Sequence, residues 1–376
     1  MQDEPAFAQL AGKSRKQAHH GPLDKFGHQT KYRRSHNLLA KQEVLRLKIE
    51  LTPNLFAQSC TLIFMITVSE EELVDYQLTA RIATEAFASP EVRFSVERIK
   101  WLYESGFENG ATVLSLSNNG EKIGQIAILS QDLYLDGEPQ SAIQIFDLFI
   151  LQKYRSLTLI RRLYKEVERV CADRNIRFVI ALPNKNSMLL NIRFLKMKPL
   201  VWLDIRAGFS FLRPRSLKLE FSGLLRSLTA DAAIGLLSNF STSTVENGLR
   251  WDGDALFNRL SDPTCDYALH ASADLLLISS PRKTRGINYT LLSGFLARPH
   301  AALTGSNVRQ LVRTACRFWK APLFIYVGVN SQLPELPGFK VPPRVRSPML
   351  VQLRDLRDEW SNARFDRFQL VDCDFV

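Results

Sequence analysis

The segment between residues 142 and 197 most constrains what this chain can fold into. The run AIQIFDLFIL predicts a buried strand, and LTLIRRLYKEVERVCADR predicts a helix with apolar residues at helical spacing. IRFVIAL predicts a second buried strand, and PNKNSMLLNIRFLKM a further helix. Parallel neighbouring strands need a crossover connection of this kind, because a tight hairpin can join only antiparallel strands. The alternation predicts an α/β (α+β) fold with a mixed central sheet flanked by helices.

The residues before this segment predict a hairpin and two helices. ATVLSLS and KIGQIAILS flank Asn119 and Gly120, which tolerate the positive φ angles of a tight hairpin turn. Ser69 followed by Glu72 has the pattern of a capping box, which predicts a helix from there to about Ala88. SVERIKWLYES predicts a second, shorter helix.

The far half repeats part of this layout. TGSNVRQLVRTACRFWK predicts a helix and APLFIYVGV a strand, and Asn330 follows that strand as Asn184 follows IRFVIALP. A single match of this kind suggests a repeat but could also arise by chance. At about 150 residues per domain, 376 residues suit two modules. We predict a basic leader at 1–64, a first module at 65–215, a joint at 216–245 and a second, incomplete module at 246–376.

Charge is concentrated in the leader. The chain carries a net charge of +11, and its first 50 residues hold ten Lys/Arg against five Asp/Glu. The leader lacks apolar periodicity, so we expect a solvated, disordered tail, with a nucleic-acid-binding arm as the alternative. The body is mildly basic, which suits an anionic cofactor as well as nucleic acid, so charge does not choose between them. Nucleic acid is not the expected partner.

Apolar runs and cysteines narrow the class of protein. No run reaches the roughly 18 apolar residues that span a bilayer, and the chain opens on a polar stretch, so we expect a cytoplasmic protein. The cysteines are odd in number and far apart, so we expect free thiols and neither a disulfide framework nor a metal site. They are Cys60, Cys171, Cys265, Cys316 and Cys373.

The segment from LFILQKYRS to NIRFLKM resembles the central motif of the GNAT superfamily of N-acetyltransferases. In that family a strand leads into an R/Q-x-x-G-x-G/A loop that opens a helix, followed by a strand and Asn-rich residues. Backbone N–H groups and the positive helix end of such a loop cradle the pyrophosphate of coenzyme A. The resemblance covers roughly residues 71–209 and implies a tandem, two-module GNAT protein with a degenerate acetyl-CoA loop.

The resemblance assigns the cofactor site residue by residue. Arg155 stands where the family has its Arg, while Ser156, Thr158 and Ile160 stand where small residues, usually glycines, are expected. It places the pantetheine arm on one strand and the pyrophosphate on the loop after it. The implied cofactor-binding residues are Phe149, Ile150, Arg155, Ser156, Leu157, Thr158, Leu159, Ile160 and Asn184.

The resemblance also implies catalytic positions. Family catalysis removes a proton from an amine through a carboxylate or water, and returns one to the thiolate, often through a Tyr. Asp147 is the candidate base, since a carboxylate in an apolar strand has a raised pKa; a structural Asp satisfied by the backbone or an Arg is the alternative. Asn191 occupies the position expected for the Tyr. Asn184 reads either as a helix cap or as a ligand contact.

These features predict an N-acyltransferase, and specifically an N-acetyltransferase. It would move an acyl group from acetyl-CoA, as co-substrate, to the primary amine of a small molecule or amino sugar, without a metal. The alternative is a catalytically inactive GNAT-like module that acts in partner binding, which the missing loop glycines and the missing Tyr favour.

Overall fold

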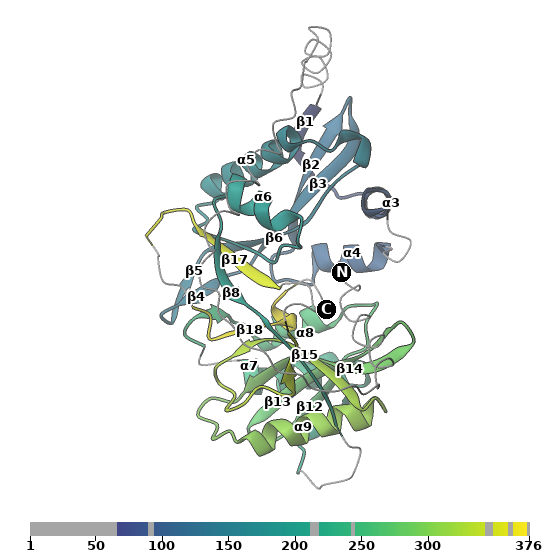
Figure 1. Cartoon of the computed structure of the whole chain (residues 1–376), viewed down its shortest axis with the longest axis vertical. Coiled ribbons are helices and arrows are strands. Elements are labelled where there is room, and N and C mark those ends of the chain that lie inside the picture. Colours follow the sequence, from purple (N-terminus) through teal and green to yellow (C-terminus); the bar gives the residue numbers. More distant parts are fainter. Residues whose placement is uncertain are drawn as a thin grey trace, which may run out of the picture.

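The computed structural model is an α/β protein built on two mixed sheets (Figure 1). One sheet has seven strands and the other has eleven. Helices α4 (Val96–Glu104) and α8 (Gly253–Leu260) lie between the sheets. The predicted leader lies outside the described residues. The structure describes residues 66–88, 94–210, 218–241, 245–342, 349–359 and 364–373.

The first sheet contains residues 142–197, the segment that most constrains the fold. Strands β6 and β7 pair in parallel and are joined by α5 (Leu157–Asp173), as predicted. Helix α5 packs the side chains of Leu163, Tyr164 and Val167 into a core on one face of the sheet. The strand order is β1 (Ile66–Glu70), β2 (Ala111–Asn118), β3 (Glu121–Ser130), β6 (Ala142–Ile150), β7 (Phe178–Ala181), β17 (Leu350–Asp355) and β8 (Lys198–Trp202).

The first predicted helix is present and ends at Phe87, close to the expected Ala88, but its predicted start at Ser69 is wrong. Ser69 lies in β1, where it pairs with Ser115 of β2, and helix α3 begins later, at Tyr76–Phe87. The side chain of Asp75 caps α3 by accepting a hydrogen bond of 2.9 Å from the amide of Leu78. The run ITVSE is rich in residues that suit strands, and pairing with β2 outweighs the local capping pattern.

The predicted hairpin is confirmed, and a second one was not foreseen. Asn119 and Gly120 join β2 to β3 with φ angles of 51° and 82°. Asp136 and Gly137 have nearly the same angles and join β4 (Leu133–Leu135) to β5 (Glu138–Gln140). This short hairpin extends away from the first sheet and pairs with β11 (Gly248–Leu249) of the second.

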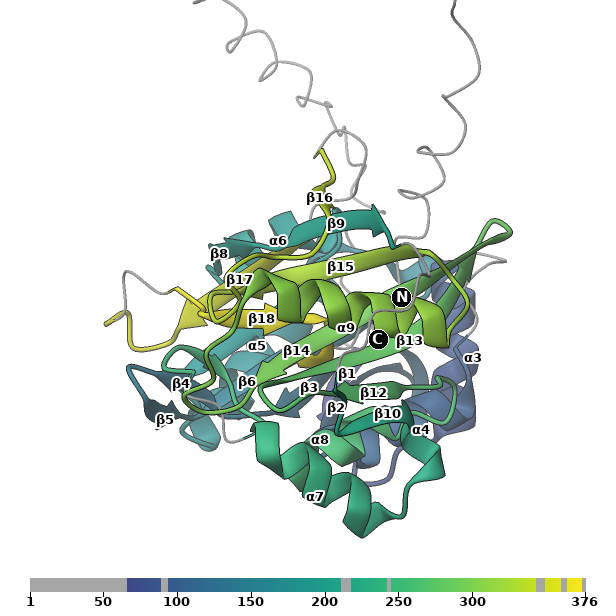
Figure 2. The same cartoon turned by 90° about the horizontal axis from the view of Figure 1, so that it is seen from below.

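The second sheet contains another parallel crossover. Helix α9 (Gly305–Phe318) joins the parallel strands β14 and β15. It covers one face of the sheet, as Figure 2 shows. Helices α7 (Ala230–Ser241) and α8 pack on the other face. The order is β10 (Phe221–Leu224), β12 (Ala268–Ala271), β13 (Leu275–Thr284), β14 (Ile287–Ala297), β15 (Leu323–Asn330), β18 (Arg367–Gln369), β11, β4 and β5. Strand β9 (Asp204–Phe209) also pairs with β15, and β16 (Phe339–Lys340) pairs with β9.

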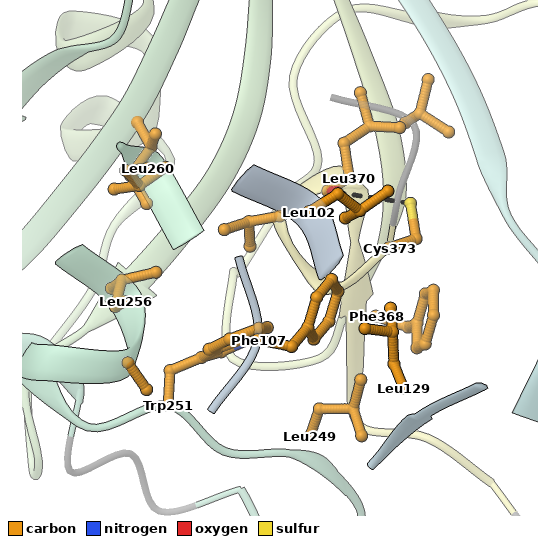
Figure 3. Packing of buried hydrophobic residues seen from close by; sticks show 14 of the residues in the cluster. Leu102, Phe107, Leu129, Leu249, Trp251, Leu256, Leu260, Phe368, Leu370 and Cys373 are labelled. Atoms are coloured by element: carbon orange, nitrogen blue, oxygen red, sulfur yellow. Dashed lines mark hydrogen bonds between the residues drawn. The ribbon is translucent and has the colours of Figure 1, made fainter. Parts of the chain in front are cut away.

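The two halves of the chain exchange strands. Strand β17 follows β15 in sequence but lies between β7 and β8 of the first sheet, where Gln352 pairs with Ala181. Apolar residues from both halves also share one core, in which Phe107 and Leu102 lie near Trp251 and Phe368 (Figure 3). Each half therefore buries part of its apolar surface against the other half.

None of the helices among the described residues is long and apolar enough to cross a membrane.

Helix α6 (Ser187–Phe194) follows β7, as predicted from the Asn-rich segment. The cysteines that the structure describes are all free: Cys171, Cys265, Cys316 and Cys373.

A buried histidine joins three elements of the second half. His270 on β12 is fully buried, and its Nδ1 and Nε2 lie 2.8 Å and 3.0 Å from the Oγ atoms of Ser222 and Ser279. The indole N–H of Trp319 donates to the same Ser279 hydroxyl at 3.0 Å. Burial lowers the pKa of His270 to about 4, because the surroundings disfavour the charged ring.

We expect this histidine to make stability depend on pH. The unfolded chain takes up a proton near pH 6.5 and the folded chain only near pH 4, so unfolding becomes easier as pH falls between these values. The loss should reach roughly 3 kcal/mol below pH 4. Urea denaturation across this range measures it. His270→Gln should remove the slope, whereas His300→Gln, at an exposed site, should leave it. An unchanged slope in His270→Gln would contradict the assignment.

Candidate functional site

Strands β6 and β7 stop pairing after Ile145 and Ala181, and a cavity of about 100 Å³ lies beyond that point. The register between β3 and β6 shifts here, so that Asp147 and Leu148 lie opposite the single residue Ile126. This is a β-bulge, which bends the strand and redirects a side chain. The cavity is lined by Phe94, Ile126, Ile145, Phe146, Asp147, Leu148, Tyr164, Ala181, Leu182, Pro183, Asn184, Ser187 and Asn191.

Asp147 forms the bulge and has a φ of 45°. Aspartate and asparagine tolerate this left-handed conformation better than other residues with a side chain. The hydroxyl of Tyr103 on α4 donates to its Oδ2 at 2.9 Å, and Gln125 Nε2 donates to that hydroxyl at 2.6 Å. Burial, and then the nearby carboxylate of Asp147, hold the pKa of Tyr103 well above its usual value, so the hydroxyl stays a donor.

A second series of hydrogen bonds reaches the cavity through Tyr164 and Asn191, which both line it. The hydroxyl of Tyr164 lies 2.5 Å from Asn191 Oδ1, and Asn191 Nδ2 lies 3.0 Å from Gln352 Oε1. Gln352 Nε2 in turn donates to the backbone carbonyl of Met188 at 3.2 Å. Tyr164, Asn191 and Gln352 are all nearly or fully buried. This series therefore connects α5, α6 and the inserted strand β17 at the cavity.

The start of α5 supplies donors at the surface. Ser156 is its N-cap: its Oγ accepts from the amide of Leu159 at 3.3 Å and its carbonyl from the amide of Ile160. The first amides of a helix have no partner within the helix, and the helix end carries partial positive charge. Ser156, Leu157 and Thr158 are exposed, so their backbone amides lie where an anion can reach them.

Side chains of the predicted loop divide between surface and core. Thr158 is exposed, Ile160 is half-buried against the core of the first sheet, and Leu159 is buried in it. Arg155 is exposed, but its guanidinium binds the nearby backbone: its Nε donates to the carbonyl of Ile150 at 2.9 Å, and its Nη2 to that of Ala86. Arg155 thus fixes the strand–loop connection, and the helix amides remain as the donors that face outward.

The remaining predicted residues lie as follows. Phe149 and Ile150 are buried and follow the bulge on β6. Asn184 lines the cavity, and its Oδ1 accepts from the amides of Asn186 and Ser187 at 2.9 Å each. Asn184 therefore binds the backbone just before and at the start of α6, whose N-cap residue is Asn186, and it does so at the edge of the cavity. The structure brings Asp147, Asn184 and Asn191 together around one space, whereas none of the predicted cofactor residues from Phe149 to Ile160 lines it.

The matching position in the second crossover is closed. Gln369 inserts beside β14, where its Oε1 accepts from the amide of Phe295 at 2.9 Å and its Nε2 donates to the carbonyl of Phe295 at 3.1 Å. Asn330 Nδ2 donates to the same carbonyl at 3.1 Å. The backbone N–H and carbonyl of Phe295 are thus occupied by side chains of the protein itself and are not offered to a ligand.

The sequence did not reveal Tyr103, Tyr164 or Gln352 as members of this site. Apolar spacing places Tyr164 on the buried face of a predicted helix, and Tyr103 lies in the segment SVERIKWLYES, which predicts a short helix. Gln352 is separated from Asn191 by 161 residues. A polar residue on a fully buried strand, as Gln352 is, was the one available signal, because buried polar groups need partners.

Known proteins match this chain at the level of one family model and of the fold. Residues 76–197 match the model of the acetyltransferase (GNAT) family. A probable N-acyltransferase from Enterococcus faecalis has a TM-score of 0.55 at 11% identity, over 77% of this chain and 73% of that chain. A GCN5-related N-acetyltransferase from Kribbella flavida has a TM-score of 0.53 at 14% identity, over 78% and 72%.

Saccharomyces cerevisiae N-myristoyltransferase with bound myristoyl-CoA has a TM-score of 0.54 at 10% identity, over 81% of this chain and 83% of that chain. At these identities the likeness concerns the fold, and it extends over both halves of the chain. A search of curated proteins gave no match.

Proposed function

We propose that this chain is an N-acyltransferase that moves an acetyl group from acetyl-CoA to a primary amine, because residues 76–197 match the model of the GNAT acetyltransferase family. The observation that carries the proposal is the cavity at the split between β6 and β7, with Asp147 on its wall and the exposed start of α5 beyond it. This arrangement offers donors for a pyrophosphate and a carboxylate near the reacting end.

The cavity of about 100 Å³ has room for a short acyl group such as an acetyl thioester. A small amine or amino sugar remains the proposed acceptor, and the protein is proposed to act in the cytoplasm without a metal.

In the proposed reaction the chain positions two partners. Backbone groups of Phe149 and Ile150 would hold the pantetheine arm, and the amides of Ser156, Leu157 and Thr158 would bind the pyrophosphate. Asp147 would accept the proton of the attacking amine, with Tyr103 orienting its carboxylate. The acyl group passes from sulfur to nitrogen, and the thiolate of coenzyme A leaves.

Ser156→Asp tests the pyrophosphate site. Aspartate caps a helix as well as serine, so α5 should stay intact, while the new carboxylate repels phosphate. We expect the affinity for coenzyme A to fall roughly tenfold, which corresponds to about 1.4 kcal/mol. Isothermal titration calorimetry measures it, supported by thermal shifts with acetyl-CoA and with ATP as a control ligand.

Ser95→Asp is the matched control, because Ser95 caps α4 in the same way and accepts from the amide of Arg98 at 3.1 Å. Its coenzyme A affinity should equal that of the wild type. If Ser156→Asp binds coenzyme A as tightly as the wild type, the pyrophosphate does not bind at α5. If the wild-type protein binds neither acetyl-CoA nor coenzyme A, the inactive, partner-binding module becomes the better description.

A further inference from the structure

The series of hydrogen bonds that ends at Tyr164 has a fixed direction. A backbone carbonyl can only accept, so the carbonyl of Met188 requires the amide nitrogen of Gln352 as its donor. The other end of the Gln352 amide, its Oε1, must then face Asn191, whose Nδ2 donates a hydrogen bond to it at 3.0 Å. Turning either amide round would bring two acceptors, or two donors, together in a buried site.

This direction determines what Tyr164 offers to the cavity. Asn191 presents its Oδ1 to the phenol, so the hydroxyl proton of Tyr164 points at Asn191 over a distance of 2.5 Å. A hydroxyl has one proton and also accepts hydrogen bonds. With the proton committed to Asn191, the phenol oxygen has only acceptor capacity left for the cavity that Tyr164 and Asn191 line together. Burial raises the pKa of Tyr164, so the phenol stays neutral.

We propose that Tyr164 binds the inner amide of coenzyme A, the one nearest the thiol, by accepting a hydrogen bond from its N–H group. Asn191 and Gln352 act as positioning residues that turn the phenol into an acceptor. The inference rests on the proposed function, because it assumes that the pantetheine arm enters the cavity. It assigns Tyr164 a binding role, and it assigns Asn191 a role different from that of the proton donor expected at its position.

Distance along α5 supports the choice of the inner amide. Tyr164 follows the N-cap Ser156 by eight residues, which corresponds to about 12 Å along a helix axis. An extended arm that starts from a pyrophosphate at the N-terminus of α5 passes its outer amide before it reaches that depth. The inner amide is therefore the N–H donor that comes level with the phenol.

The test compares two ligands on Tyr164→Phe. Coenzyme A carries the pantetheine arm, whereas adenosine 3′,5′-bisphosphate lacks it. The variant keeps the aromatic ring but loses the acceptor, so its dissociation constant for coenzyme A should rise about two- to tenfold, the range for one neutral hydrogen bond. The dissociation constant for adenosine 3′,5′-bisphosphate should not change. Calorimetry measures both, at a temperature where the melting curve shows folded protein.

Tyr326→Phe is the matched control. Tyr326 is fully buried, and its hydroxyl donates to an amide oxygen, that of Gln369, at 3.2 Å, but it lies in the closed crossover of the second half. Its affinity for coenzyme A should equal that of the wild type. An analogue of coenzyme A with an ester in place of the inner amide gives a second measurement that needs no variant: its affinity for the wild-type protein should fall by the same factor.

The outcomes separate the two proposals. If the wild type binds coenzyme A and neither Tyr164→Phe nor the ester analogue changes the affinity, the inference is wrong and the proposed function stands. Equal weakening of both ligands by Tyr164→Phe would show a general disturbance of α5 and also overturn it. If the wild type binds neither ligand, the proposed function fails and this inference fails with it. If the variant does not fold, the ester analogue decides.

Discussion

Asp147→Asn should lower kcat/KM for acyl transfer by roughly 10² to 10⁴, the range for removing a positioned general base. An amide cannot take the proton of the attacking amine. The rest of the site should persist, because asparagine tolerates the φ of 45° and its oxygen can still accept from Tyr103 at the position of Oδ2. Release of the coenzyme A thiol measures the rate, with the amine that reacts fastest with the wild type among small amines and amino sugars.

Asp136→Asn is a close control, because Asp136 also has a positive φ, of 51°, but lies in the turn between β4 and β5. It should retain wild-type activity. Coenzyme A affinity should stay within about twofold of the wild type in both variants, because a base acts on the amine and not on the cofactor arm. Full activity of Asp147→Asn would show that this carboxylate is a structural residue of the bulge.

Local patterns were sufficient to predict the first crossover. In α5 the apolar side chains return at helical spacing, β7 is a continuous apolar run, and β6 is apolar except for Gln144 and Asp147, so the sequence indicates their type directly. Ser69 shows the limit of a local pattern, because the capping box competes with a pairing partner on β2 that lies far along the chain. The insertion of β17 beside β7 depends on a similar distant pairing, which no local pattern records.

The same division applies to the candidate site. Asp147 and Asn184 could be placed because each lies at a fixed point of the strand–helix pattern, the middle of β6 and the end of β7, and both line the cavity. Their partners could not be placed. Tyr103 approaches Asp147 from 44 residues away, and what Asn191 does depends on Gln352 from the inserted strand. Such contacts follow from packing in three dimensions and not from spacing. The roles assigned to these residues, and the boundaries of the two modules, stay predictions.

Arg98→Met should lower the free energy of unfolding by about 3 to 5 kcal/mol, because it leaves a buried carboxylate without its cation. Arg98 Nη1 lies 2.6 Å from Asp262 Oδ2, and the Asp262 side chain is fully buried. The pair joins α4 of the first half to the segment after α8 of the second, beside the hydrogen bond of 2.9 Å from Trp101 Nε1 to the carbonyl of Asn258. Urea denaturation measures the change.

The comparison with an exposed pair shows why burial decides the size of the effect. Arg169→Met breaks ion pairs on the surface of α5, where Arg169 is 53% exposed, and should cost less than about 1 kcal/mol. Arg98→Met combined with Asp262→Asn should recover part of the loss, since the isolated buried charge is then gone. If Arg98→Met costs no more than Arg169→Met, the pair does not hold the two halves together. If the urea transition also splits into two steps, the halves unfold separately once this contact is lost.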